Sequence, residues 1–173
     1  SDCLYQFVRV DNGLFLILKE GFNAELAKKD GVSNFVKAYL KKCYESMPIQ
    51  HLGGAVIYAK NDSDIYFAFV HDIFGHWTLS KGKIPEGIDP KDGTISKVME
   101  EVGLVVKIVS DLGQNEYIAN DPEIGKIRKQ VHYYLAESKF GELTLAKKPG
   151  LDDAKWFKLS DILELNFYND ILP

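Results

Sequence analysis

The sequence predicts an α+β fold, in which several short strands accompany a small number of amphipathic helices. Apolar, often β-branched runs at residues 14–18, 65–70 and 104–109 have the length of strands rather than of helices. By contrast, residues 89–103 carry both the start and the stop signals of a short helix. The 173 residues, 46% of them hydrophobic and 12% aromatic, suffice for one well-buried domain and a small additional segment.

Residues 1–50 predict an N-terminal extension made of a β-hairpin and helices. Asp11-Asn12-Gly13 separates strand-like runs at residues 4–10 and 14–19, and an Asn-Gly pair favours a tight hairpin turn. Asn23 can cap a short helix at residues 24–29, and Ser33 begins a longer amphipathic helix that Pro48 ends. The apolar stripe of this helix must pack on the hairpin, on the main domain or on a second chain. A homodimer through the extension is therefore one open alternative.

Residues 51–173 predict the main domain, after a boundary that falls within residues 46–53. Gly53-Gly54 precedes two strands at residues 55–59 and 65–70, which a polar turn joins. Beyond the helix, we expect strands at residues 104–109, 116–119, 131–136 and 142–147, with a basic loop at residues 120–129. Trp156-Phe157 ends the last strand, before a helix capped by Ser160.

The helix at residues 90–102 is the most completely specified element. Asp89 is a strong N-cap candidate, Pro90 suits the first helical position, and Gly103 is typical of the residue that stops a helix. One polar cluster on this helix contains Lys97, Glu100 and Glu101. Paired carboxylates next to a loop with two lysines, Lys81 and Lys83, are suited to a magnesium-phosphate site. The alternative is a solvated helix face beside an ordinary glycine turn.

The stretch from Gly82 to Leu104 resembles the Nudix box, G-x5-E-x7-R-E-U-x-E-E-x-G-U, in which U is aliphatic. Without a gap, Val98 and Leu104 fall on aliphatic positions, and Glu100 and Glu101 fall on the Glu-Glu pair. Residues 77–83 resemble the motif W-x-L-P-K-G-K/H of the branch that handles dinucleoside polyphosphates and diphosphoinositol polyphosphates. Residues 129–136 and 152–163 resemble two later segments of that branch. The resemblance implies an α/β/α sandwich around a mixed sheet.

Three positions depart from the box, and they bear on chemistry more than on fold. Ile88 stands where the first Glu belongs, Ser96 where the Arg belongs, and Lys97 where the third helix Glu belongs. An ammonium at position 97 repels magnesium and can pair with Glu101 instead. A Ser96 hydroxyl lacks the reach and charge by which the family's Arg orients the glutamates. Glu86, two residues before Ile88, is a substitute carboxylate on the same loop.

The resemblance implies a role for each remaining candidate. Glu101 and Glu86 are the catalytic candidates, and Glu100 with Glu101 would hold Mg²⁺ or Mn²⁺ if the protein is active. Tyr117 is the candidate for stacking on a base. The candidates for contacting phosphate are Lys81, Lys83, Lys97 and Lys129.

Two functions follow from these residues. In the first, the protein binds a nucleoside-diphosphate-linked or dinucleoside polyphosphate ligand, and its pyrophosphohydrolase activity is weakened or lost, with no cofactor required. In the second, it is an active magnesium-dependent Nudix pyrophosphohydrolase that takes its base from a loop Glu or Asp. An RNA- or protein-binding Nudix subunit is a further alternative.

The composition constrains the partners and the compartment. A net charge of −4 gives no overall attraction to nucleic acid or membrane, so a polyanion must be attracted locally. Cys3 and Cys43 lack the spacing of a zinc site and are expected to be free thiols of a reducing compartment. No apolar run reaches the roughly 20 residues of a membrane span, and the first residues do not resemble a signal peptide. We therefore expect a cytoplasmic protein without membrane contact.

Overall fold

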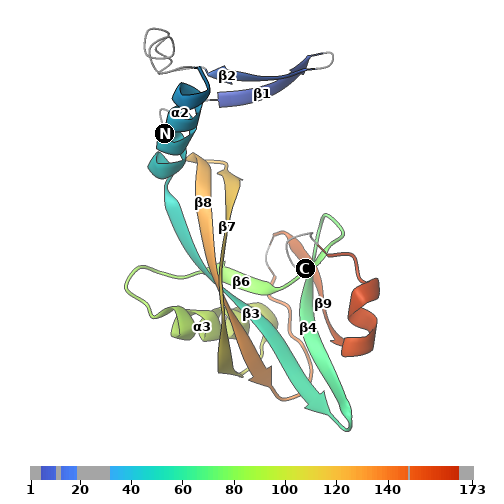
Figure 1. Cartoon of the computed structure of the whole chain (residues 1–173). Helices are drawn as coiled ribbons and strands as arrows, with labels where there is room; N and C mark the ends of the chain where they lie inside the picture. The colour runs from blue at the N-terminus through green and yellow to red at the C-terminus, as the bar shows by residue number, and fades with distance from the viewer. Residues whose placement is uncertain (1–4, 11–12, 19–31, 148, 168–173) are drawn as a thin grey trace. The chain divides into compact units, whose positions relative to one another are not determined.

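The computed structural model describes residues 5–10, 13–18, 32–147 and 149–167 (Figure 1). Contacts between residues divide the chain into two units. The first contains Ser1–Ile49 with Ile118–Arg128, and the second contains Gln50–Tyr117 with Lys129–Pro173. The division into residues 1–50 and 51–173 stays a prediction, because the first unit also takes up a segment from the middle of the chain.

The first unit begins with the predicted hairpin. Strands β1 (Tyr5–Val10) and β2 (Gly13–Leu18) pair antiparallel, with Val10 opposite Gly13. Helix α2 (Val32–Ser46) confirms the longer helix predicted from Ser33, and it buries Tyr39 and Cys43 at a spacing of four residues. Cys43 is fully buried, whereas Cys3 lies outside the described residues. The short helix predicted at residues 24–29 lies outside the described residues.

The second unit contains most of a seven-stranded sheet, and parts of β3, β7 and β8 belong to the first unit. The strands of this sheet are β3 (Ile49–Asn61), β4 (Asp64–Asp72), β5 (Trp77–Thr78), β6 (Ser80–Lys83), β7 (Val106–Asp121), β8 (Gly125–Ser138) and β9 (Leu151–Lys158). The order is β5-β4-β3-β8-β7, with β6 pairing to β3 and β9 pairing to β4. Most neighbours are antiparallel, whereas β3 and β8 run in the same direction (Figure 1). The sheet is therefore mixed, and the α+β prediction is confirmed.

Helix α3 (Pro90–Val102) has the predicted bounds and the predicted caps. The Asp89 carboxylate accepts hydrogen bonds from the backbone N–H of Lys91 at 2.9 Å and of Asp92 at 3.3 Å. Gly103 adopts φ of 72°, the left-handed conformation, and its N–H donates to the Met99 carbonyl. Local sequence signals alone therefore define both ends of this helix.

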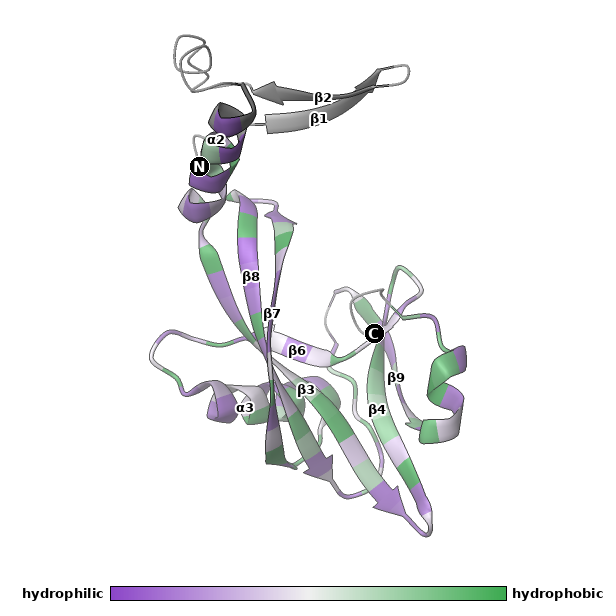
Figure 2. Cartoon of the chain, in the orientation of Figure 1, coloured by the Kyte–Doolittle hydropathy of each residue, from purple (hydrophilic) through white to green (hydrophobic). Residues whose placement is uncertain are grey.

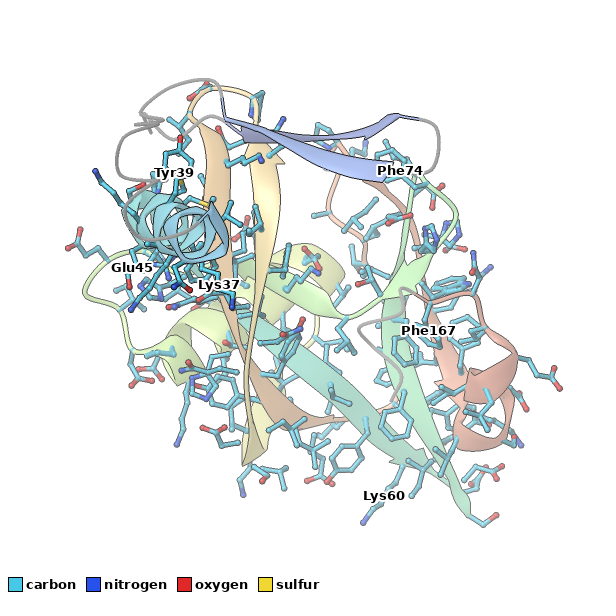
Figure 3. All side chains as sticks on the ribbon, turned by 45° about the horizontal axis from the view of Figure 1, so that its top comes forward. Lys37, Tyr39, Glu45, Lys60, Phe74 and Phe167 are labelled. Carbon is cyan, nitrogen blue, oxygen red and sulfur yellow. The ribbon has the colours of Figure 1, made fainter. Side chains whose placement is uncertain are left out.

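Helix α3 packs on one face of the sheet and forms the main core. Val98 and Val102 of the helix lie against Ala55 and Ile57 of β3, all at most 1% exposed. Figure 2 shows apolar residues along β3 and β4. On the other side of β4, the Phe69 ring meets Phe167, labelled in Figure 3, with ring centroids 4.8 Å apart. One face of the sheet thus packs against α3, whereas the other carries aromatic rings. Among the described residues, no helix is long and apolar enough to cross a membrane.

Several predicted boundaries are wrong. The strands expected at residues 104–109 and 116–119 are one strand, β7, and β8 begins at Gly125, inside the expected loop. The Asp121 side chain accepts from the N–H of Glu123 and of Ile124, and Gly125 has φ of 80°, so a tight turn replaces the loop.

The C-terminal part differs from the prediction in two further ways. Residues 142–147 form no strand; instead the N–H groups of Thr144 and Ala146 donate to carbonyls at the end of α3. The last helix is a 3-10 helix, η1 (Leu159–Glu164), which Ser160 does not cap. The Ser160 hydroxyl donates instead to the carboxylate of the neighbouring Asp161. The segment after β8 therefore closes the helix end rather than extending the sheet.

The contact between β3 and α3 depends on Gly53. A Cβ atom at this position would lie 1.9 Å from Thr94 Oγ1, and Thr94 is only 1% exposed. We expect Gly53→Ala to lower the free energy of unfolding by about 1–3 kcal/mol, because the helix must shift away from the sheet. Urea denaturation measures this. Gly141→Ala is the matched control, since nothing lies within 4 Å of its Cβ position. Equal stability of both variants would contradict the packing described.

Candidate functional site

Strand β6 separates the predicted site residues into two groups. The Ser80 hydroxyl donates to Glu101 of α3, and the Gly82 backbone lies against Lys97 of the same helix. Because side chains alternate along a strand, Lys81 and Lys83 point to the opposite face of β6. Alternation therefore places the two lysines and the Ser80–Glu101 contact on different faces of this strand.

Lys97 is enclosed between the helix and the strand. A Cβ atom at Gly82 would lie 2.7 Å from Lys97 Cδ, so the aliphatic chain of the lysine rests directly on the glycine. Its ammonium is 2.6 Å from Glu100 Oε2. The sequence predicted that Lys97 could pair with Glu101; the structure gives it Glu100 instead. At a spacing of three residues, the two side chains meet on one face of the helix.

Glu101 is buried, at 5% exposed, and its carboxylate Oε1 accepts from the Ser80 hydroxyl at 2.9 Å. Its backbone carbonyl accepts from the Ala146 N–H at 2.8 Å. Ser80 was not among the predicted site residues, although it stands where the motif of residues 77–83 has proline. That departure was the signal that could have identified it.

The box residues do not fit a divalent cation. One carboxylate is bound by an ammonium, and the other is buried and bound by a hydroxyl. Within the part of the chain that the structure describes, no three His, Cys, Asp or Glu side chains form a group that could hold a metal ion. Glu86 lies exposed in the turn before α3, and none of the hydrogen bonds or ion pairs of the described residues links it to Glu100 or Glu101.

The opposite face of β6 brings other predicted residues together. Lys81 Nζ lies 5.4 Å from the centroid of the Tyr117 ring, in cation–π geometry. Gly54 pairs with Lys81 in the sheet, and a Cβ at Gly54 would lie 2.6 Å from the Tyr133 ring, so Tyr133 shares this face. Gln130 donates to Glu116 across the strands, which by alternation places Tyr117 and Lys129 on the same opposite face. This set, Lys81, Tyr117, Lys129 and Tyr133, is called the tyrosine-lysine face below.

A second polar cluster joins β7 and β8. His132 Nε2 is 2.6 Å from Asp111 Oδ2, and the His132 ring stacks on Tyr134 with centroids 4.5 Å apart. The Gly113 N–H, and then the His132 ring, lower the pKa of Asp111 below its usual range. Burial, with the charges of Asp111 and Asp89, raises the pKa of Tyr134. The sequence predicted a strand at residues 131–136 but did not identify Asp111.

The fold and the site define an α+β domain in which a capped helix carrying paired glutamates packs on a mixed sheet. A family model described as the NUDIX domain matches residues 54–172. The chain belongs to the NUDIX family.

Solved structures agree with this fold. An Ap4A hydrolase binary complex from C. elegans is 23% identical, covering 70% of this chain and 89% of that chain, with a TM-score of 0.55. The NUDIX domain of Shewanella oneidensis NrtR, complexed with ADP ribose, is 19% identical, covering 80% and 90%, with a TM-score of 0.57. A MutT NUDIX hydrolase from Burkholderia pseudomallei is 18% identical, covering 70% and 92%, with a TM-score of 0.55. At these identities the likeness is one of fold.

The Ser80–Glu101 bond is the most buried polar contact of the box. We expect Ser80→Ala to lower the free energy of unfolding by about 1.5–3 kcal/mol, because a buried carboxyl loses a hydroxyl donor. Chemical denaturation measures the loss. Ser138→Ala, which removes an exposed hydroxyl bond to the Val105 carbonyl, should change stability much less. A Ser80 variant as stable as the Ser138 variant would show that Glu101 does not depend on this donor.

Proposed function

We propose that this protein binds a nucleoside-diphosphate-linked or dinucleoside polyphosphate ligand, and that its pyrophosphohydrolase activity is weak or lost. The observation that carries the binding proposal is the contact of Lys81 with Tyr117. A lysine predicted to meet phosphate and a ring predicted to meet a base come from distant segments and lie side by side. The names of two structural neighbours, an Ap4A hydrolase and a domain complexed with ADP ribose, point to the same ligand class.

The tyrosine-lysine face offers both kinds of contact that such a ligand needs. The Tyr117 and Tyr133 rings are half-buried, which fixes their orientation while leaving surface for a base to stack on. Lysine ammonium groups act as point charges for phosphate oxygens. Lys81 and Lys129 lie on this face, and Lys83 follows Lys81 with the same side-chain direction. Because the chain as a whole is acidic, this local charge would be what attracts a polyphosphate.

The proposed weakness of hydrolysis follows from the box. In the Nudix resemblance, carboxylates at positions 97, 100 and 101 act on a diphosphate through a divalent cation. Here position 97 is a lysine bound to Glu100, and Glu101 is bound to Ser80. A metal ion supplies several kcal/mol of transition-state stabilisation, and each 1.36 kcal/mol lost slows a reaction about tenfold. Binding by lysines and aromatic rings needs none of this chemistry.

Calorimetry tests the binding proposal, with ADP ribose and diadenosine tetraphosphate as the probes. We expect Tyr117→Ala to weaken binding roughly 5- to 150-fold, which corresponds to about 1–3 kcal/mol of base stacking. Lys81→Gln alone should also weaken binding, and the loss should be larger at low salt than at high salt. Lys60→Gln is the matched control, because Lys60 is an exposed lysine near the far end of β3 (Figure 3). Unchanged affinity in both site variants would refute the assignment of this face.

Chromatography of the nucleoside phosphates formed from each probe, measured on the same samples, separates binding from turnover. We expect no cleavage of ADP ribose or diadenosine tetraphosphate above background, with or without magnesium. Metal-dependent cleavage that Glu101→Gln abolishes would establish the active pyrophosphohydrolase instead, with Glu101 as its catalytic carboxylate.

A further inference from the structure

The chain contains two lysine-glutamate pairs that differ sharply in their surroundings. On α2, Lys41 Nζ and Glu45 Oε1 are 3.8 Å apart, and their side chains are 76% and 61% exposed. On α3, Lys97 Nζ and Glu100 Oε2 are 2.6 Å apart, and the lysine side chain is only 27% exposed. Exposed helix pairs of the first kind contribute little to stability, because water screens both charges. The second pair is held by packing as well as by charge.

Packing determines where the Lys97 ammonium lies. The Cβ, Cγ and Cδ atoms of Lys97 all lie within 3.3 Å of the position that a Cβ atom on Gly82 would occupy. The lysine chain therefore fills the space that the missing side chain leaves between β6 and α3. Its rotamers are restricted, so little entropy is lost when the ammonium meets Glu100.

Charge determines what that ammonium does. Replacing a carboxylate by an ammonium at position 97 changes the local charge by two units, which converts a cluster of three negative groups into one ion pair and one hydrogen-bonded carboxyl. Three neighbouring carboxylates repel one another unless a cation lies among them. In this chain the ammonium group of Lys97 provides that positive charge.

We infer that Lys97 is the built-in cation of the box: it neutralises Glu100 and fastens α3 to β6, so that this protein needs no divalent ion to hold its box together. This inference concerns the box face of β6 and does not depend on whether the tyrosine-lysine face binds a nucleotide. It assigns to Lys97 a positioning role, in place of the phosphate contact that the sequence predicted.

Charge reversal tests the inference, with Mn²⁺ as the probe and the melting temperature as the readout. We expect the melting temperature of the wild-type protein to be the same in Mn²⁺ and in EDTA. Lys97→Glu should melt at a lower temperature in EDTA, and Mn²⁺ at about one hundred times its Kd should raise that temperature by roughly 5–10 °C. Electron paramagnetic resonance of free Mn²⁺ gives the stoichiometry directly.

Matched variants keep the result interpretable. Lys41→Glu makes the same charge reversal on an exposed pair and should show no response to Mn²⁺. Lys97→Gln removes the cation without adding a ligand, and it should melt at a lower temperature than Lys41→Gln.

Three results would overturn the inference. The first is wild-type stabilisation by Mn²⁺ that Glu100→Gln removes. The second is a folded Lys97→Glu variant that ignores Mn²⁺. The third applies if Lys97→Glu does not fold. Equal melting temperatures of Lys97→Gln and Lys41→Gln would then show that Lys97 does not hold α3 against β6.

Discussion

The close approach of α3 to β6 is the constraint on which the rest of this site depends. A helix can lie this near a strand only where the strand lacks a side chain, and Gly82 provides that place. Once the helix is there, Ser80 on the same face of β6 reaches Glu101, and Lys97 covers the glycine. The carboxyl groups of the helix are thereby committed to partners within the protein before any ligand arrives.

The alternation of side chains along β6 then places the contacts with α3 and the contact with Tyr117 on opposite faces of the strand. Ser80 and Gly82 serve the helix, whereas Lys81 lies over Tyr117 on the other face. A change that alters the ion pair on one face need not alter the cation–π contact on the other, because the strand lies between them. The residues of the box and the groups proposed to contact a polyphosphate therefore lie on different faces of one strand.

Local signals predicted local structure well and long-range structure poorly. The ends of α3 follow from Asp89, Pro90 and Gly103, which act on their own neighbours. Strand β7 was predicted in two pieces, because its middle residues are polar and the pairing with β8 that extends it is not visible in a short window. The site was also predicted incompletely, because its contacts join residues that are distant in the sequence. Spacing placed Lys97 near both glutamates, but only packing on Gly82 selects Glu100.

The Lys97–Glu100 pair and the Ser80–Glu101 hydrogen bond differ in their contribution to stability, because the two glutamates differ in burial. Glu100 is 52% exposed on its side chain, so water would solvate it even without Lys97, and the charge of the pair contributes less to stability than the packing of Lys97 on Gly82. Glu101 is 5% exposed, so the Ser80 hydroxyl contributes to stability directly. Ile88, at 49% exposed, places an apolar group that cannot bind a cation where the box has a carboxylate. The exposed position that lacks its carboxylate, Ile88, is therefore tolerated in solvent, whereas the buried carboxylate that remains, Glu101, has a hydroxyl donor within the protein.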